Sequence, residues 1–357
     1  MICPHCRTSL TRRERPEHRC SRCRRAFALD PKVEPGRLHD IKFRELVAKG
    51  TGGRLQITVE QLYWLNERRL YGFPGPRDRR RHIVFGSLAT AAALGAAAVA
   101  VLADAALLPG AIALFATGRA IQDFHSVWRM RAGAPLHPKL SPIRFQYQVI
   151  DRWREVYGAL PPGLVDDPPP AVPTPALAKA RAVVLCELSA VTAFLRANDF
   201  ARRHQVLLVD ELAKVPAGLP VVVLRDLSLS ALTRTVAIRA ALPGRRVVDA
   251  GLAPRAVLEP AKAIRLHDLR KPQVPAALAA APGWRRLTGR ERAWLTSGRY
   301  SPLITLPPTK LLILAEKAVH RATTAPPSEP PDQARRRAQQ IGFLTWPTAP
   351  PTDGAAR

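Results

Sequence analysis

The hydrophobic and polar positions divide the chain into segments of different character. The longest apolar run covers residues 83–103, which hold no charged side chain. As a helix this run is about 31 Å long, enough to cross the hydrocarbon core of a bilayer. After Asp104 a second apolar stretch continues to Gly118, interrupted by Pro109 and Gly110. The pattern predicts a transmembrane segment, and the alternative is a buried helix of a soluble protein.

Arginines on both sides of the apolar run determine how often we expect the chain to cross the membrane. One group precedes the run and another follows it: Arg77, Arg79, Arg80, Arg81, then Arg119, Arg129, Arg131, Arg144, Arg152 and Arg154. A single crossing would place the second group outside, which the positive-inside rule disfavours. We therefore predict a transmembrane helical hairpin over residues 83–121 in the cell membrane, with two crossings and both termini cytoplasmic. The second leg is short and needs tilt or snorkelling of Arg119.

Short apolar runs alternate with helical patterns between residues 177 and 322. The runs typical of strands cover residues 182–186, 206–209, 221–224 and 246–249. The helical patterns between them cover residues 189–198 and 228–241. Such alternation predicts a parallel sheet covered by helices on both faces. Further helices follow, one of them opened by a capping box of Thr288 and Glu291. The sequence thus predicts a C-terminal α/β domain over 177–322.

Shorter segments complete the predicted organisation. Residues 38–72 predict a small helical segment, in which Thr58 caps a helix and Gln61 takes the reciprocal capping-box position. Residues 141–160 carry apolar side chains at helical spacing among arginines, which fits an amphipathic helix on the membrane or a helix packed on the next domain. The proline-rich residues 161–176 predict a stiff linker. The proline-rich residues 323–357 predict a disordered tail.

The formal net charge of +27 is typical of proteins that bind nucleic acids or anionic lipids. The positive charge is spread along the chain, without a stripe of basic residues interleaved with aromatic ones. Arginine outnumbers lysine, and alanine and proline are abundant, which is also the bias of GC-rich coding sequence. We therefore favour a solvated surface with a membrane-side bias over a nucleic-acid groove.

Four of the five cysteines form two CxxC pairs separated by thirteen residues: Cys3-Pro-His-Cys6 and Cys20-Ser-Arg-Cys23. Each CxxC turn presents two thiolates from one tight loop, and zinc prefers four such ligands in a tetrahedron. The pairs, with Phe27 in the strand-like segment that follows, resemble a zinc ribbon over residues 1–30. The resemblance implies a structural Zn²⁺ ion held by Cys3, Cys6, Cys20 and Cys23. A closed site of this kind has no open coordination position for catalysis.

Other uses of these residues remain open at this point. Two disulfides would need an oxidising compartment, and His5 and His18 lie near enough to compete as zinc ligands. Cys186 stands alone in an apolar run and is expected to be a buried small hydrophobe. The odd cysteine number, the absence of Asn-x-Ser/Thr sequons and the lack of an apolar N-terminal core favour a reduced, cytoplasmic setting.

Acidic residues follow the predicted strands, at the edge where open α/β sheets bind ligands. They are Glu187, Asp210, Asp226 and Asp249. The arrangement over residues 182–249 is similar to a Toprim domain, in which a glutamate after the first strand and a later DxD pair hold magnesium. Glu187 and Asp226 match those places and become candidate catalytic residues. Ser228 replaces the second aspartate, and Leu188 replaces the glycine that the family has after its glutamate.

The alternative for these strand ends is ordinary helix capping, with Ser189 and Ser228 as caps. The chain has no GxxxxGK[ST], GxGxxG, HExxH or GxSxG motif. We therefore interpret it as a multidomain, membrane-anchored recruitment or scaffolding protein, with catalytic activity the less favoured reading. Its expected partners are the lipid bilayer and a protein bound by the zinc ribbon or the α/β domain. The alternatives are a Toprim-like phosphoryl or nucleic-acid enzyme and a membrane-held nucleic-acid binder.

Overall fold

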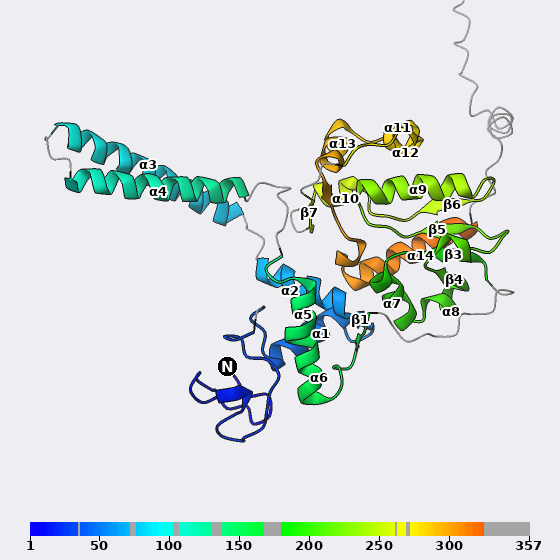
Figure 1. Cartoon of the computed structure of the whole chain (residues 1–357), viewed down its shortest axis with the longest axis horizontal. Helices are drawn as coiled ribbons and strands as arrows, with labels where there is room; N and C mark the ends of the chain where they lie inside the picture. Colours follow the sequence, from blue (N-terminus) through cyan, green and yellow to red (C-terminus); the bar gives the residue numbers. More distant parts are fainter. Residues whose placement is uncertain are drawn as a thin grey trace, which may run out of the picture.

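The chain forms a body of helices and sheets, from which a pair of long helices projects (Figure 1). The computed structural model describes residues 1–34, 36–71, 76–102, 107–129, 138–167, 180–260, 263–268 and 272–324. The predictions for Asp104 and for the tail beyond residue 324 fall outside these residues.

The predicted parallel sheet is present. Its strands run in the order β4-β3-β5-β6, and all neighbours are parallel. The strands are β3 (Ala182–Leu185), β4 (Val206–Val209), β5 (Val221–Val223) and β6 (Val247–Asp249). The connecting elements are α7 (Ser189–Ala197) and α8 (Phe200–His204), the short η4 (Leu212–Lys214), and α9 (Leu229–Ala241). The short, β-branched runs of the sequence therefore became strands at the predicted places.

Both faces of the sheet are covered, as predicted for a parallel sheet. On one face Val183 and Val221 pack with Ile238 of α9. On the other, Val184 and Val222 share a core with α7 and with α14 (Pro308–Thr324). Successive strand residues point to opposite faces, so a continuous valine run can serve both cores.

The remaining C-terminal elements surround this sheet. They are α10 (Pro254–Leu258), β7 (Leu266–His267), α11 (Ala276–Ala280), α12 (Pro282–Arg285), α13 (Gly289–Thr296), β8 (Arg299–Tyr300) and η5 (Leu303–Thr305). Strands β7 and β8 pair antiparallel. The capping box of Thr288 and Glu291 is confirmed at the start of α13. Ser228 caps α9 as expected, but Ser189 is the first residue of α7 and makes no cap, because Leu188 occupies the N-cap position.

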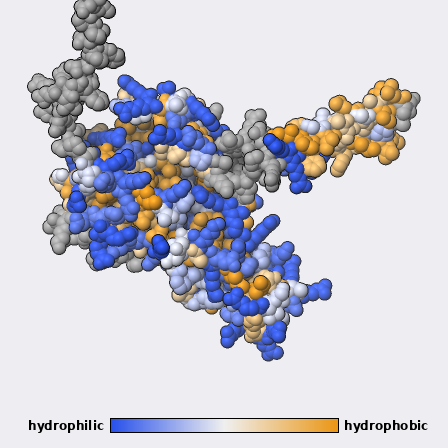
Figure 2. Space-filling model, turned by 180° about the vertical axis from the view of Figure 1, so that it is seen from behind, coloured by the Kyte–Doolittle hydropathy of each residue, from blue (hydrophilic) through white to orange (hydrophobic). Residues whose placement is uncertain are grey.

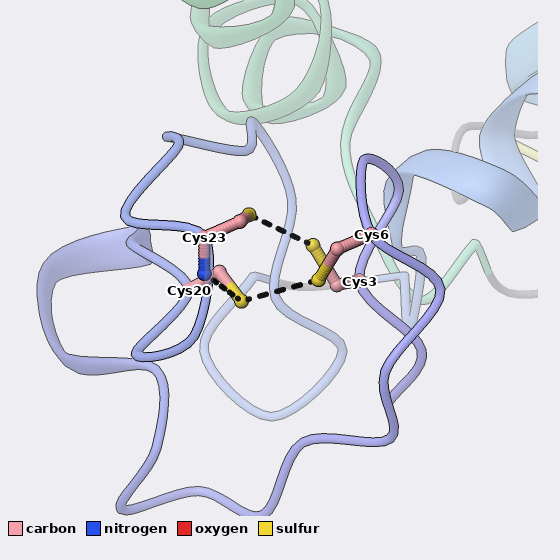
Figure 3. A group of neighbouring side chains, drawn as sticks. All are labelled: Cys3, Cys6, Cys20 and Cys23. Atoms are coloured by element: carbon pink, nitrogen blue, oxygen red, sulfur yellow. Dashed lines mark hydrogen bonds between the residues drawn. The ribbon is translucent and has the colours of Figure 1, made fainter.

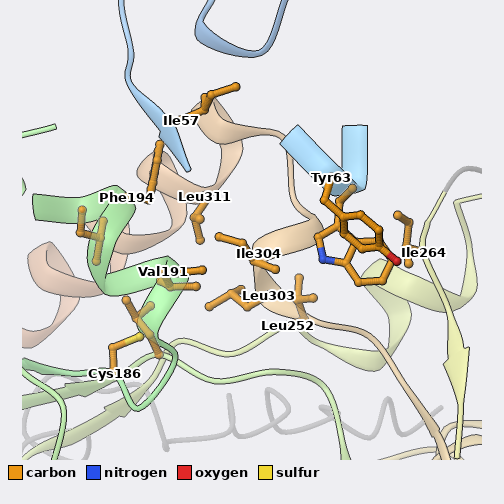
Figure 4. Packing of buried hydrophobic residues seen from close by; sticks show 14 of the residues in the cluster. Ile57, Tyr63, Cys186, Val191, Phe194, Leu252, Ile264, Leu303, Ile304 and Leu311 are labelled. Carbon is orange, nitrogen blue, oxygen red and sulfur yellow. The ribbon is translucent and has the colours of Figure 1, made fainter. Parts of the chain in front are cut away.

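The N-terminal helices belong to the same body as the sheet. They are α1 (Asp40–Thr51), α2 (Val59–Tyr71), α5 (Pro142–Phe145), the π-helical η2 (Gln146–Asp151) and α6 (Arg152–Tyr157). Thr58 and Gln61 form the predicted reciprocal hydrogen bonds at the start of α2. One buried cluster runs from Ala28 to Ala322 through both parts. Figure 4 shows Ile57 and Tyr63 packed in the cluster that contains Val191 and Leu311.

The shared core bears on two of the predicted segments. The expected linker 161–176 begins with an ordered strand, β2 (Leu164–Val165), which pairs in parallel with β1 (Ile57–Thr58); residues 168–179 lie outside the described residues. In segment 141–160, a stripe of buried side chains packs on the body: Phe145, Val149, Ile150 and Trp153. Of the two alternatives for that segment, packing on the protein is the observed one.

The projecting arm consists of α3 (Pro76–Leu102) and α4 (Leu107–Arg129), which lie side by side (Figure 1). A Cβ atom added at Gly86 of α3 would lie 3.3 Å from the ring of Phe124, so the helices approach closely there. Among the described residues, one helix, Arg80–Leu102, has the length and composition to cross a membrane. Figure 2 shows the arm as a largely apolar surface apart from its root.

Candidate functional site

The four predicted zinc ligands lie together at the N-terminus (Figure 3). Their sulfur atoms all lie within 4.8 Å of one another. Cys3 Sγ is 3.8 Å from Cys23 Sγ, and Cys6 Sγ is 3.8 Å from Cys20 Sγ. A tetrahedral zinc site with Zn–S bonds of about 2.3 Å places its sulfur atoms about 3.8 Å apart. The thiolate set therefore fits one tetrahedral ion.

The disulfide alternative does not fit this geometry. The sulfur contacts of 3.8 Å are well beyond a disulfide bond of about 2.05 Å. Each short contact also joins one CxxC pair to the other, as a shared ion requires. All five cysteines, including Cys186, are free thiols.

The two CxxC loops share the same backbone conformation and hydrogen-bond pattern. Arg7 donates its N–H to the Cys3 carbonyl and Arg24 donates to the Cys20 carbonyl, at 3.2 and 2.8 Å. Both arginines have positive φ, 61° and 59°, the left-handed conformation that closes such turns. Backbone N–H groups also point at sulfur, from His5 to Cys3 at 3.4 Å and from Cys23 to Cys20 at 3.5 Å. Such N–H groups stabilise the negative charge of a cysteine sulfur that ligates a metal ion.

The protein environment shifts the acidity of the thiols in opposite directions. Burial raises the pKa of Cys3 to about 12. Hydrogen bonding with Thr8, whose hydroxyl oxygen lies 3.5 Å from Cys6 Sγ, lowers the pKa of Cys6 to about 6. A metal ion must displace the proton from Cys3 on binding, so metal occupancy of this site depends on pH.

The two nearby histidines are engaged elsewhere. His5 Nε2 lies 2.8 Å from the carbonyl oxygen of Ala26. His18 Nε2 lies 2.6 Å from Glu34 Oε1, and its ring packs on Phe27 with centroids 5.6 Å apart. Both rings thus stabilise the ribbon around the cysteines rather than adding ligands.

Two buried carboxylates stabilise the ribbon, Asp30 from within it and Asp40 from the adjoining helix α1. Asp30 pairs with Arg15 at 2.8 Å, and both side chains are 4% exposed. Asp40, at the start of α1, accepts the backbone N–H groups of Ala28 and Leu29 at 3.0 and 2.8 Å. The sequence analysis missed both acids, and the position of Asp40 directly before a helical stripe was the available signal.

The candidate catalytic residues lie at the carboxyl edge of the sheet. Glu187 Oε1 receives two N–H groups from Arg234 of α9, at 3.0 and 2.7 Å. Asp226 Oδ1 accepts the backbone N–H of Leu303 at 2.6 Å. Burial raises the pKa of Asp226. Glu187 thus links β3 to α9, and Asp226 links the end of β5 to the start of η5.

The other strand-end residues are also engaged. Asp249 pairs with Arg225 at 2.7 Å, and Asp210 pairs with Lys214 at 2.9 Å. The hydroxyl of Ser228 accepts the N–H of Ala231 at 3.0 Å. Over the described residues, the four cysteines form the only group of three or more ligating side chains close enough to hold one ion. The four acids were found from sequence, whereas the arginine partners of Glu187 and Asp249 were not, because those arginines lie 47 and 24 residues away along the chain.

Cys186 lies at the end of β3 and is 2% exposed. Burial raises the pKa of its thiol to about 11. Its sulfur donates to the carbonyl of Leu188 at 3.6 Å. A thiol that stays protonated at neutral pH is a poor nucleophile, in agreement with the expected buried, inert role.

A scan against protein-family models, a search of curated proteins and a search of solved structures each gave no match for this chain.

Proposed function

We propose that this protein is a membrane-anchored cytoplasmic scaffold. A helical hairpin holds it in the bilayer, and the zinc ribbon and the α/β body recruit a protein partner. The observation that carries the proposal is a contact at the root of the arm. Lys139, after α4, donates its backbone N–H to Glu67 of α2 at 2.7 Å and its ammonium to the Leu70 carbonyl at 3.0 Å.

This contact bears on the number of crossings. Residue 70 lies just before α3, and residue 139 lies just after α4, so the chain enters and leaves the arm at one place. Tyr63 of α2 adds a hydrogen bond from its hydroxyl to the Leu140 carbonyl at 2.8 Å. A single crossing would separate these residues by the thickness of a bilayer. The contact therefore supports two crossings, with the turn on the far side.

The surface of the arm supports a lipid environment. Large apolar side chains on both helices are mostly exposed: Leu88, Leu94, Val101, Leu102, Leu107, Leu108, Leu114 and Phe115. Soluble proteins rarely expose so large a continuous apolar surface. Polar contacts are instead placed near the root, where His82 of α3 meets Asp123 of α4 at 2.7 Å. An ion pair between Arg119 and Asp123 at 3.0 Å turns that arginine toward the root.

The bound ion in this proposal is zinc, and its role is to fold the ribbon. Four cysteine thiolates at tetrahedral spacing are the ligand set that zinc takes in closed structural sites. A segment this short needs such an ion to fold stably. With its four ligands supplied by protein, the ion supplies structure and leaves the ribbon surface free for docking.

Topology is the first test of the proposal. We would label introduced cysteines in intact cells with a membrane-impermeant maleimide, using Leu107→Cys near the turn and Ser328→Cys in the tail. The expected result is that position 107 reacts in intact cells, while position 328 reacts only after permeabilisation. Labelling of position 328 from outside would contradict the hairpin.

Recruitment is the second test. Crosslinking in native membranes with the wild-type chain and with Cys20→Ser should give a partner band whose yield falls in the variant, while Cys186→Ser keeps it. Magnesium-dependent phosphodiester hydrolysis by the wild-type chain, lost in Asp226→Asn, would overturn the scaffold proposal in favour of an enzyme.

A further inference from the structure

The zinc ribbon carries an excess of exposed arginine. Residues 1–25 contain eight arginines and no lysine, against two acids, Glu14 and Glu17. Arg15 is buried and pairs with Asp30, whereas the other seven arginines are exposed. None of these seven forms an ion pair with a carboxylate in the described part of the chain. Their charge is therefore available to an anionic partner outside the chain.

Three of the exposed arginines lie at the end of the ribbon formed by the two CxxC loops. Arg7 directly follows the first CxxC pair, and Arg22 and Arg24 flank Cys23. The four cysteine sulfurs lie within 4.8 Å of one another, so the two loops are side by side. Arg22 also donates across the loops to the hydroxyl of Thr8 at 3.4 Å. Both CxxC loops thus bring guanidinium groups to the same end of the ribbon.

A continuous helix connects the ribbon to the root of the arm. It consists of α5, η2 and α6, over residues 142–157, and is about 24 Å long. Just before its start, the Leu140 carbonyl accepts the hydroxyl of Tyr63 at the root of the arm. Near its end, Arg152 Nε donates to the carbonyl oxygen of Ala28 at 3.1 Å, where the ribbon joins the body. These contacts hold the ribbon at a defined place relative to the root of the arm.

The ribbon lies on the side of the body from which the arm projects (Figures 1 and 2). In Figure 1 the arm and the ribbon, which carries the N label, both extend to the left of the parallel sheet. A bilayer around the arm therefore has its near surface on the side of the ribbon. Arg80 and Arg81, which are exposed near the start of α3, add positive charge at the same surface.

We propose that the arginines of the zinc ribbon bind anionic phospholipid headgroups in the leaflet nearest the body. Guanidinium groups form paired hydrogen bonds with phosphate and carboxylate oxygens, and both occur in such headgroups. Each arginine near an anionic membrane surface strengthens binding by about fivefold. The place of the ribbon beside the bilayer favours lipid over a nucleic acid.

This inference rests on the proposed hairpin, which brings the ribbon to the bilayer. It gives the ribbon a function beyond partner recruitment. Folded by its ion, the ribbon is a second contact with the membrane, beside the arm. Two contacts at different places fix the orientation of the body on the membrane.

The test reconstitutes the full-length protein in vesicles of phosphatidylcholine, or of an equal mixture of phosphatidylcholine and phosphatidylserine. Phenylglyoxal modifies exposed arginine side chains, and mass spectrometry of the digested protein gives the reaction rate at each position. Arg285 and Arg286 of α12 are the internal control, because both are exposed and α12 lies away from the arm and the ribbon (Figure 1).

In the mixed vesicles the reaction at Arg7, Arg22 and Arg24 should be slower by about fivefold or more than in phosphatidylcholine. The reaction at Arg285 and Arg286 should be unchanged. High salt should remove the difference at the ribbon, because it screens the attraction between exposed charges. Equal rates at the ribbon in the two kinds of vesicle, or the same slowing at α12, would overturn the inference.

A pair of matched variants tests the same contact by mutation. Arg22→Gln combined with Arg24→Gln should make Arg7 react faster in the mixed vesicles, because the remaining ribbon charge binds lipid more weakly. Arg285→Gln combined with Arg286→Gln removes two charges from α12 and should leave Arg7 protected. Protection of Arg7 that is equal in both variants would contradict the proposal.

Two further arms separate the alternatives. Flotation with pure phosphatidylcholine vesicles tests the hairpin alone. A chain that does not float refutes the anchor and the inference with it, whereas a chain that floats without protection of its ribbon arginines refutes only the inference. Protection of these arginines by a DNA duplex, and not by phosphatidylserine, would replace the lipid by a nucleic acid as the partner of the ribbon.

Discussion

Asp40 Oδ1 accepts the backbone N–H of Leu29 at 2.8 Å, and this bond joins the first helix of the body to the end of the zinc ribbon. The other oxygen accepts the N–H of Ala28 at 3.0 Å and the hydroxyl of Tyr157. The carboxylate is fully buried. Its charge is therefore stabilised by three donors from two different parts of the chain.

The first prediction concerns this carboxylate. Asp40→Asn replaces one accepting oxygen by an N–H₂ group that faces donors, so we expect it to lower the free energy of unfolding by about 1–3 kcal/mol. Glu45→Gln on the same helix is the control, because Glu45 is exposed and pairs with the exposed Lys42; it should change stability by less than about 1 kcal/mol. Thermal unfolding of the detergent-solubilised protein measures both, and equal shifts would refute the assigned role.

The second prediction concerns the metal. Elemental analysis of protein purified under reducing conditions should find one zinc per chain, and Cys20→Ser should lose it. Cys186→Ser should retain it, because Cys186 lies outside the cysteine cluster. Zinc should also dissociate as pH falls, since protons compete for the thiolates. A wild-type chain without zinc would be the contrary result.

The parts of the fold predicted correctly are those whose signal is local. The valine-rich runs at 183 and 221 and the capping boxes at Thr58 and Thr288 each depend on a few adjacent residues. Each CxxC turn is also a local signal, because its two cysteines are three residues apart, so the cysteine cluster could be predicted from the spacing.

The parts predicted poorly depend on contacts between distant residues. Strand β2 pairs with β1 across more than 100 residues, and its two residues give no pattern by themselves. The prolines around it suggested a linker. The buried cluster shared by the N-terminal helices and the sheet was also not predicted, because an amphipathic helix shows that one of its faces is buried without showing what covers that face. At the sheet edge, Glu187 was visible in the sequence, but its partner Arg234 lies 47 residues away.

The third prediction concerns the root of the arm. Glu67 is 1% exposed and accepts the N–H of Lys139 at 2.7 Å. Glu67→Ala removes the buried acceptor of this hydrogen bond, so we expect a loss of about 1.5–3 kcal/mol in the free energy of unfolding, the range for a hydrogen bond to a charged group. Glu67→Gln keeps an acceptor oxygen and should lose less. If the two variants were equally stable, the bond to Lys139 would not be holding the ends of the arm together.

The fourth prediction is a pH dependence that arises at Asp167. Its Oδ2 accepts the N–H of Glu60, at the start of α2, at 2.9 Å. Burial, with the nearby Glu60 as a smaller cause, raises the pKa of Asp167 to about 6. Between the unfolded pKa near 4 and this value, the folded state binds more protons than the unfolded state. The contribution of Asp167 to stability therefore falls as pH rises from about 4 to 6.

Replacing Asp167 by Asn removes this titration and keeps an oxygen that can accept the Glu60 N–H. We expect Asp167→Asn to match the wild type near pH 4 and to be more stable by about 1–2 kcal/mol above pH 6. The neighbouring Asp166→Asn is the control, because Asp166 is 52% exposed and pairs with Arg154; its effect should be small and should not grow over that interval. Thermal unfolding at several pH values between 4 and 8 measures the difference. A constant offset between Asp167→Asn and the wild type would show that the folded protein does not raise the pKa of this carboxyl.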